Sequence, residues 1–150
     1  IYVWKEVDGM KLSYHYMLMT NHMLLQKRLL SGLKDTGLTA GQPKVLDYLQ
    51  DHDGANQKEI AAGCRIEAGS LTSVLNRMEE KGLVQRRMLD GNRRTYYIFL
   101  TEKGKELLRI VKNKFEELEE EAFIGISDED KETFMKLFFR IYSNMTAREE

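Results

Sequence analysis

The sequence is poor in the residues that would indicate a secreted, disulfide-bonded or membrane-spanning protein. Its 150 residues include one cysteine, one proline and one tryptophan. A single cysteine excludes a disulfide within the chain and a cysteine-rich zinc site, and no apolar run approaches the roughly 18 to 20 residues that span a bilayer. No cleavable signal precedes the first expected helix, so we expect a cytoplasmic protein that does not enter membranes.

The chain also lacks the large net charge that often marks a nucleic-acid-binding protein, since its formal charge is −1. That total hides an uneven distribution. Residues 1–55 hold six basic and six acidic groups, residues 56–100 hold eight and five, and residues 101–150 hold nine and thirteen. A basic middle third can bind a polyanion although the whole chain is nearly neutral.

Motifs for catalysis are missing as well. The sequence contains no GxSxG, no Walker loop, no dinucleotide-binding glycine pattern and no HExxH. None of its three histidines has a neighbouring serine or cysteine in a recognisable nucleophile setting. We therefore expect a protein that is not an enzyme and carries no cofactor.

Long amphipathic helices are predicted near both ends of the chain. Apolar residues such as Leu12 recur at helical spacing over residues 10–33. A second long helix is predicted over residues 102–124, where Thr101 can cap its start, and Ser127 can cap a last helix. The apolar lines on these helices exceed what one small domain could cover, so a partner surface is expected.

Three shorter helices are predicted between them, over residues 40–51, 57–63 and 68–81. The segment "TAGQ", which begins at Thr39, has the capping-box pattern, and Asn56 with Glu59 forms a second one. Gly82 stands where a glycine ends a helix. Two helices joined by a turn of about four residues form the helix-turn-helix unit.

The helix predicted over residues 68–81 has one apolar stripe and an opposite polar face. The stripe comprises Leu71, Val74, Leu75 and Met78. The polar face carries hydroxyl, amide and guanidinium groups, which can hydrogen-bond base edges and phosphates from the major groove. Its residues are Ser70, Thr72, Ser73, Asn76 and Arg77. Simple solvation is the alternative for such a face taken alone.

A β-hairpin is predicted next. Residues 83–88 and 93–100 favour strands, and "LDGN" forms the turn between them. Four arginines lie around this turn, namely Arg86, Arg87, Arg93 and Arg94. A helix-turn-helix followed by an arginine-rich hairpin predicts a winged helix-turn-helix, in which the helix and the hairpin engage a duplex together.

From about Leu38 to Leu108 the sequence resembles the MarR family of bacterial transcriptional regulators. The stretches that carry the resemblance are "LTAGQPKVLDYL", "NQKEIAAGCRIEAGSLTSVLNRMEEKGLVQR" and "RRTYYIFLTEKGKELL". The resemblance implies a mainly α fold with a small β-hairpin wing. Residues 37–101 would form the winged DNA-binding domain, and residues 1–36 and 102–150 would form the helical dimerisation region.

The resemblance also implies a function. The protein would be a homodimer that binds a palindromic operator in double-stranded DNA and represses a nearby gene or its own. A small, often aromatic or phenolic, effector would release it. On the DNA, Ser70, Ser73, Asn76 and Arg77 would face the major groove, with Thr72 on the same polar face. The expected phosphate contacts are Lys58, Arg86, Arg87 and Arg93.

The wing pattern of the family assigns one arginine in particular. Counting back from Leu100 places Arg94 on the arginine that enters the minor groove in the family. The family's acidic position holds Asn92 here, whose amide cannot orient an arginine by charge, and Asp90 lies two residues away. Ser73 stands where many members carry arginine, so the operator sequence does not follow from the resemblance.

His15, Met19 and His22 share one helical face near the start of the chain. Two histidines seven residues apart could bind a metal or a ligand carboxylate. No acidic residue or cysteine completes a metal set nearby, so no metal is expected. Two interpretations stay open for this face: lining of the effector cleft, which lies beside this helix in the family, and ordinary interface packing.

Two other functions stay open. A winged fold can serve protein interaction, in which case the arginine-rich hairpin would bind an acidic protein partner. A regulator that responds to oxidation through Cys64 is the other, because some members of the family sense peroxide with a cysteine. Those cysteines lie in the first helix, whereas Cys64 lies where the helix-turn-helix needs an apolar core residue.

Overall fold

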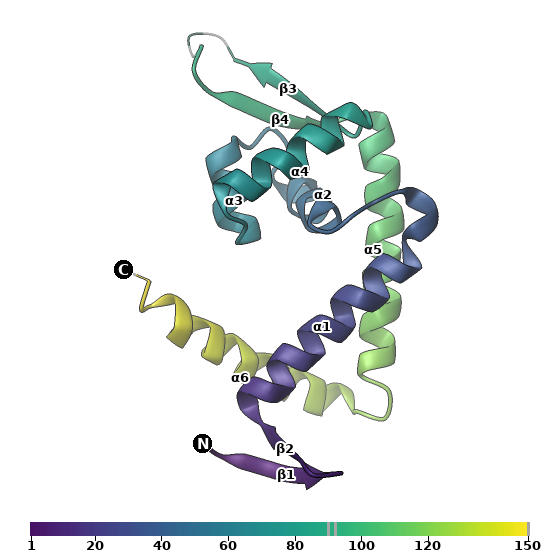
Figure 1. Cartoon of the computed structure of the whole chain (residues 1–150), viewed down its shortest axis with the longest axis vertical. Helices are drawn as coiled ribbons and strands as arrows, with labels where there is room; N and C mark the ends of the chain where they lie inside the picture. The colour runs from purple at the N-terminus through teal and green to yellow at the C-terminus, as the bar shows by residue number, and fades with distance from the viewer. Residues whose placement is uncertain (90, 92, 150) are drawn as a thin grey trace. The chain divides into compact units, whose positions relative to one another are not determined.

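The chain begins with a hairpin, and its second strand lies where the start of a helix is predicted. The computed structural model in Figure 1 describes residues 1–89, 91 and 93–149. Strands β1 (Val3–Val7) and β2 (Met10–Ser13) pair antiparallel. Asp8 and Gly9 join them with φ angles of 50° and 78°, the left-handed conformations of the type I′ turn that Asp-Gly favours. The prediction of a helix is therefore wrong for residues 10–13, and Leu12 lies in β2.

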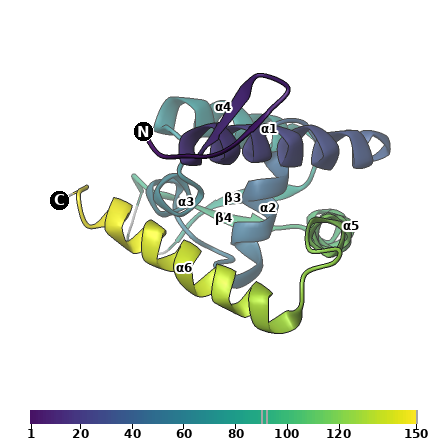
Figure 2. The same ribbon diagram turned by 90° about the horizontal axis from the view of Figure 1, so that it is seen from below.

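Helix α1 (Tyr14–Gly32) starts after this hairpin, and β2 runs directly into it (Figure 2). Ser13 caps the helix, because its hydroxyl accepts a hydrogen bond from the N–H of Tyr16 at 3.4 Å. A short 3-10 helix, η1 (Lys34–Thr36), follows α1. Gly37 caps η1 with a φ of 74°, whereas α1 itself ends earlier, at Gly32, with Leu33 as its cap.

Three helices and a second hairpin form the winged part of the structure. They are α2 (Gln42–Asp51), α3 (Gln57–Cys64), α4 (Ala68–Glu80), β3 (Val84–Met88) and β4 (Tyr96–Leu100). Their core consists of apolar side chains without exposed surface: Val45, Leu46, Leu49, Ile60, Leu71, Leu75, Met78 and Ile98. Burial of such side chains contributes roughly 1.5 to 3 kcal/mol each, which makes this core the main source of stability. It also fixes which face of α4 points outward.

The capping predictions in this part hold at one helix and fail in detail at another. Asn56 and Glu59 form the predicted capping box of α3, with each side chain accepting the other residue's backbone N–H at 2.9 and 3.1 Å. Helix α2 begins at Gln42 rather than residue 40, because Gly41 adopts a φ of 86° and becomes its cap. Half of the "TAGQ" box forms, since Gln42 Oε1 accepts the N–H of Thr39 at 3.0 Å.

The wing is attached to the helix-turn-helix through its second strand. β3 and β4 pair antiparallel, as the sequence predicts, and the register places Val84 opposite Leu100. The segment between α2 and α3 adds to the other edge of β4: Ile98 donates its N–H to Ala55 O at 2.9 Å and accepts the N–H of Gly54 at 2.8 Å. The wing base therefore cannot pivot without breaking backbone hydrogen bonds to the helical part.

The structure forms two compact units, Ile1–Glu116 and Glu117–Glu150, so their boundary falls within α5 (Glu102–Ala122). The winged domain predicted over residues 37–101 lies inside the first unit. Thr101 caps α5 as predicted, because its hydroxyl accepts the N–H of Gly104 at 3.0 Å.

The second unit is built on α6 (Asp128–Thr146), which Ser127 caps by accepting the N–H of Asp130 at 3.1 Å. Phe134 stacks on Phe138 with ring centroids 5.4 Å apart. The apolar residues of α6 are nevertheless exposed, among them Phe134, Met135, Leu137, Phe138, Phe139, Tyr142 and Met145. Across the described residues, none of the helices has the length and apolar character needed to cross a bilayer.

Candidate nucleic-acid interface

Helix α4 presents its polar face to solvent. Leu71, Leu75 and Met78 are fully buried on its inner side. The predicted face opposite is exposed along its length, and it includes Ser70, Ser73, Asn76 and Arg77. This exposure follows from the sequence, because the apolar stripe must face the core and the polar residues lie opposite it. The expected orientation of α4 is therefore confirmed.

Thr72 lies on the same face but is already engaged. Its hydroxyl donates to Ala68 O at 3.0 Å and accepts a hydrogen bond from Gln57 Nε2 at 2.6 Å. Gln57, the first residue of α3, was not predicted as a site residue. Its position beside Lys58, an exposed predicted phosphate contact at the same helix start, was the only sequence signal that could have suggested it.

The wing carries exposed arginines in a region that is not strand. β4 starts at Tyr96 rather than residue 93, so Arg93 and Arg94 lie in the connection to β3, where both are exposed. They lie beyond the last strand pair of the hairpin, Met88 with Tyr96. Asp90 and Asn92 lie outside the described residues, so the predicted effect of Asn92 on the wing stays a prediction.

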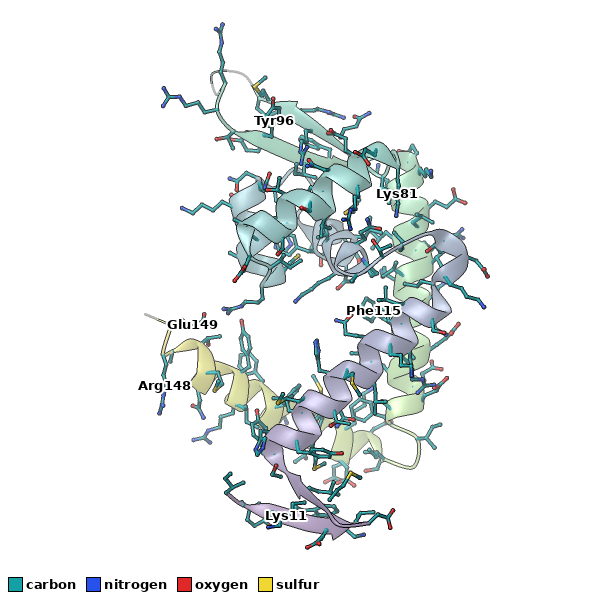
Figure 3. All side chains as sticks on the ribbon, in the orientation of Figure 1. Lys11, Lys81, Tyr96, Phe115, Arg148 and Glu149 are labelled. Atoms are coloured by element: carbon teal, nitrogen blue, oxygen red, sulfur yellow. The ribbon has the colours of Figure 1, made fainter. Side chains whose placement is uncertain are left out.

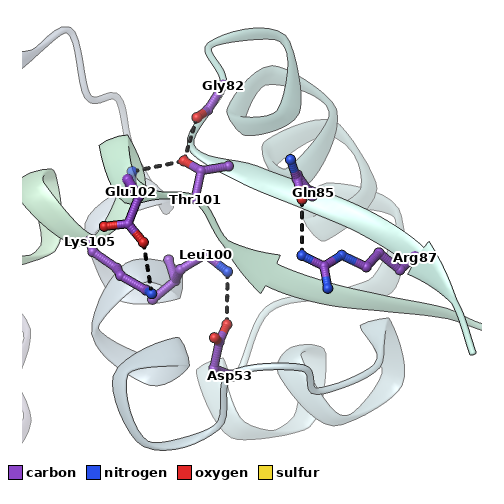
Figure 4. A network of polar contacts seen from close by, with 9 residues as sticks. Asp53, Gly82, Gln85, Arg87, Leu100, Thr101, Glu102 and Lys105 are labelled. Carbon is purple, nitrogen blue, oxygen red and sulfur yellow. Dashed lines mark hydrogen bonds and ion pairs between the residues drawn. The ribbon is translucent and has the colours of Figure 1, made fainter.

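Arg87 packs along the wing. Its guanidinium lies 4.6 Å from the centre of the Phe99 ring and donates to Gln85 Oε1 at 3.1 Å (Figure 4). A guanidinium stacked on an aromatic ring keeps its charge and part of its hydrogen-bonding edge available. Arg87 is thus held in one orientation on the exposed side of β3, where its guanidinium can still contact a phosphate.

Arg86 points toward the helix instead. Its side chain is only 19 % exposed and lies 3.7 Å from a carboxylate oxygen of Glu79 on α4. A groove runs between this helix and the wing, and Figure 3 marks Tyr96 on its wing side. The groove is lined by Gln57, Thr72, Asn76, Glu79, Arg86 and Tyr96. Arg86 therefore differs from its neighbour Arg87, because the Glu79 carboxylate already holds it.

The helical face of α1 that was predicted to line an effector cleft or to pack in an interface is exposed to solvent. His15, Met19 and His22 are all exposed, and a ring nitrogen of His15 lies 3.2 Å from Ser13 Oγ. Within the described part of the chain, no three His, Cys, Asp or Glu side chains gather in a way that could hold a metal ion. Whether this face lines an effector cleft stays a prediction.

Cys64 is buried at the end of α3. Its side chain is 1 % exposed and its sulfur lies 3.7 Å from Lys44 O. Burial raises the pKa of the thiol, although the nearby Lys44 ammonium acts in the opposite direction. A thiol that stays protonated is a poor nucleophile toward oxidants. The prediction that Cys64 packs in the core is confirmed.

Comparisons with known proteins agree with this geometry. Residues 38–96 match the sequence model of the MarR family. An uncharacterized HTH-type transcriptional regulator of Bacillus subtilis (strain 168), YwoH, is 34% identical over 115 residues, which cover 77% of this chain and 83% of that protein.

Two solved structures with bound DNA have a similar fold. The S. aureus MepR–DNA complex superposes with a TM-score of 0.82 at 23% identity, covering 90% of this chain and 99% of that one. A MarR family regulator from Listeria monocytogenes, complexed with 26mer DNA, gives a TM-score of 0.85 at 18% identity, with 93% and 92% covered.

Proposed function

The chain belongs to the MarR family of transcriptional regulators, and we propose that it acts as a homodimeric repressor that binds a palindromic operator through α4 and the β3–β4 wing of each subunit. The observation that carries this proposal is the exposed polar face of α4 beside an exposed, arginine-bearing wing. Two proteins of similar fold were solved with DNA bound, which supports the same use of these elements here.

Each group has a proposed role on the duplex. The outer face of α4, with Ser73 and Asn76 near its centre line, enters the major groove. Arg94 enters the minor groove. Lys58, Arg87 and Arg93 contact phosphates, to which charged groups bind without regard to sequence. Arg86, also expected at a phosphate, can reach one only by leaving Glu79.

Dimer formation is proposed to cover the apolar surface that a single chain leaves exposed. α1 exposes Met17, Leu18, Met23, Leu24 and Leu25, and α6 exposes a row of aromatic and aliphatic side chains. Monomeric proteins rarely expose so much apolar surface on neighbouring turns of a helix. A symmetric dimer built from residues 1–36 and 102–150 would bury these faces and present two α4 helices about 34 Å apart, one turn of DNA.

A small-molecule effector is proposed to release the protein from its operator. His15, Met19 and His22 on α1 are the proposed contacts, since imidazoles and a thioether suit a flat aromatic or phenolic ligand with an acidic group. Such a repressor acts in the cytoplasm, where its operator is found.

The test starts from a pool of random duplexes from which the bound sequences are recovered. We expect a palindrome whose half-sites lie about 10 base pairs apart, centre to centre. Arg94→Ala should then weaken binding to the recovered operator and leave dimerisation unchanged. Arg109→Ala is the matched control, because Arg109 is an exposed arginine on α5, outside α4 and the wing.

One outcome would overturn the proposal, and a second would remove one part of it. Recovery of no preferred sequence, together with capture of an acidic protein through the wing, would favour the protein-interaction alternative. Equal affinity of Arg94→Ala and wild type would remove the minor-groove role of Arg94 while leaving DNA binding itself intact.

A further inference from the structure

We propose that Lys81 is a positioning residue that ties the C-terminal end of α4 to both connections between the winged part and the long helices α1 and α5. The contacts of Lys81 with Gly37, Gln42 and Lys103 are named here the Lys81 junction. The inference rests on the proposed role of α4 in binding DNA. It adds a residue that does not touch DNA but sets where α4 is held.

The Lys81 side chain reaches back across the fold. Lys81 follows the last residue of α4, and its Nζ donates to Gly37 O at 2.5 Å and to Gln42 Oε1 at 3.1 Å. Gly37 lies in the connection between α1 and α2, and Gln42 is the first residue of α2, so both acceptors stand about forty positions earlier in the chain. Figure 3 marks Lys81 at this end of α4. The ammonium is thus directed inward, away from the exposed face that we assign to the duplex.

The backbone of the same residue is held by α5. Lys103, in the first turn of α5, donates its Nζ to Lys81 O at 2.9 Å. Next to it, the Thr101 hydroxyl donates to Gly82 O at 2.6 Å (Figure 4). Carbonyls at the end of a helix lack partners within the helix, and cationic side chains stabilise them. Here those partners are Thr101 and Lys103, at the start of the proposed dimerisation region.

Gln42 completes the Lys81 junction, although the burial of its amide nitrogen is energetically unfavourable. It is fully buried, and its Oε1 accepts from both the N–H of Thr39 and the ammonium of Lys81. Two donors at one end fix the orientation of the amide, because its nitrogen could not accept them. The Nε2 atom is then buried without a hydrogen-bond partner among the described residues. An apolar side chain would avoid that cost, but it would leave both the Thr39 N–H and the Lys81 ammonium without this acceptor, so the amide links the start of α2 to Lys81.

The junction has a consequence for DNA recognition. In the proposed dimer, the separation of the two α4 helices depends on how each one is held against α1 and α5. Lys81 contacts both connections. Its loss should therefore make the distance between the two α4 helices more variable, without changing any group that faces a base. We expect Lys81 to control tolerance for half-site spacing rather than preference for base sequence.

The experiment compares Lys81→Met with wild type on operators whose half-site spacing changes one base pair at a time. Methionine keeps the length of the side chain and removes its donors. The wild type should show a sharp optimum, and the variant should lose roughly two- to thirtyfold of the discrimination between the optimum and its neighbours. The salt dependence of binding should not change, because Lys81 contacts no phosphate. Lys105→Met, on the exposed part of α5, is the control and should keep the sharp optimum.

A second variant keeps the proposal testable if Lys81→Met does not fold. Lys103 is exposed, so Lys103→Met should fold normally, as circular dichroism will check, and should also broaden the spacing optimum. An unchanged optimum in the folded variants would overturn the junction proposal and leave the proposed function standing. A salt slope lowered by about one in Lys81→Met would also overturn it, since Lys81 would then contact a phosphate. A wild type that binds no duplex at any spacing would overturn both proposals.

Discussion

Gln57 Nε2 donates a hydrogen bond of 2.6 Å to the hydroxyl of Thr72, so the first residue of α3 is tied to the middle of α4. This contact joins the two helices of the helix-turn-helix on the side that faces solvent, at one end of the groove between α4 and the wing. It orients a hydroxyl on the proposed DNA-binding face before any DNA is bound.

Removing this contact should weaken DNA binding with little effect on the fold. A hydrogen bond of this kind is worth about 1 kcal/mol, so Gln57→Ala should reduce operator affinity about fivefold. Gln50→Ala, an exposed glutamine on α2, is the matched control. Titration of labelled operator with each variant measures the effect. Equal operator affinities of Gln57→Ala and Gln50→Ala would mean that DNA binding does not depend on the hydrogen bond between Gln57 and Thr72.

The wing arginines should separate by their salt dependence. Arg93→Gln removes an exposed charge that we assign to a phosphate, so the slope of log affinity against log salt concentration should fall by about one. Arg86→Gln should leave the slope unchanged, because Glu79 already holds Arg86. Titrations at four or five salt concentrations give both slopes. A lower slope in Arg86→Gln would show that Arg86 leaves Glu79 when DNA binds.

Dimerisation should depend on the apolar face of α6. Phe138→Glu places a charge among exposed aromatic side chains, and we expect a monomer that has lost most of its operator affinity. Phe138→Leu keeps the face apolar and should remain a dimer. Analytical ultracentrifugation at micromolar concentration distinguishes the two states. A dimeric Phe138→Glu would move the proposed interface away from this part of α6.

The stability of the chain should respond to pH through Asp47. Partial desolvation, and then the neighbouring Asp51 carboxylate, raise the pKa of Asp47 above 3.8, while Lys112 opposes the shift. A carboxyl whose pKa is raised on folding binds its proton more tightly in the folded state. Its contribution therefore favours folding less as pH rises from about 3.8 through the raised value, and it is unfavourable at neutral pH.

Asp47→Asn removes that unfavourable contribution. The variant should melt at a higher temperature than wild type at pH 7, and the gap should close as pH falls toward 4. Thermal melts followed by circular dichroism from pH 4 to pH 7 test the sign of this difference in melting temperature. A variant that is less stable at pH 7 would mean that the attraction between Asp47 and Lys112 outweighs desolvation.

Much of the fold could be predicted from the sequence because its signals are local. The Asn56 and Glu59 capping box, the glycine after α4 and the serine before α6 each act within a few residues, and each one works as expected. The inner and outer faces of α4 followed from helical periodicity. Periodicity misled at residues 10–13, where the Asp8–Gly9 turn pairs the backbone with the preceding strand.

The candidate site was harder to predict from the sequence, because it depends on contacts between residues that are distant along the chain. Nothing in the sequence pairs Lys81 with Gly37, or Arg86 with Glu79, since side-chain direction follows from the packing of whole helices and strands. Arg86 and Arg87 are neighbours with the same chemistry. The alternation of a strand sends one toward α4 and the other over Phe99, and only the strand register decides which.

The central claim is that α4 and the wing bind duplex DNA, and titration of the selected operator across salt concentration tests it most directly. The account predicts a linear fall of log affinity with log salt concentration. Its slope should reflect several phosphate contacts, and it should become shallower by about one in Arg93→Gln. An affinity that does not change with salt, or a slope equal in wild type and Arg93→Gln, would contradict the account.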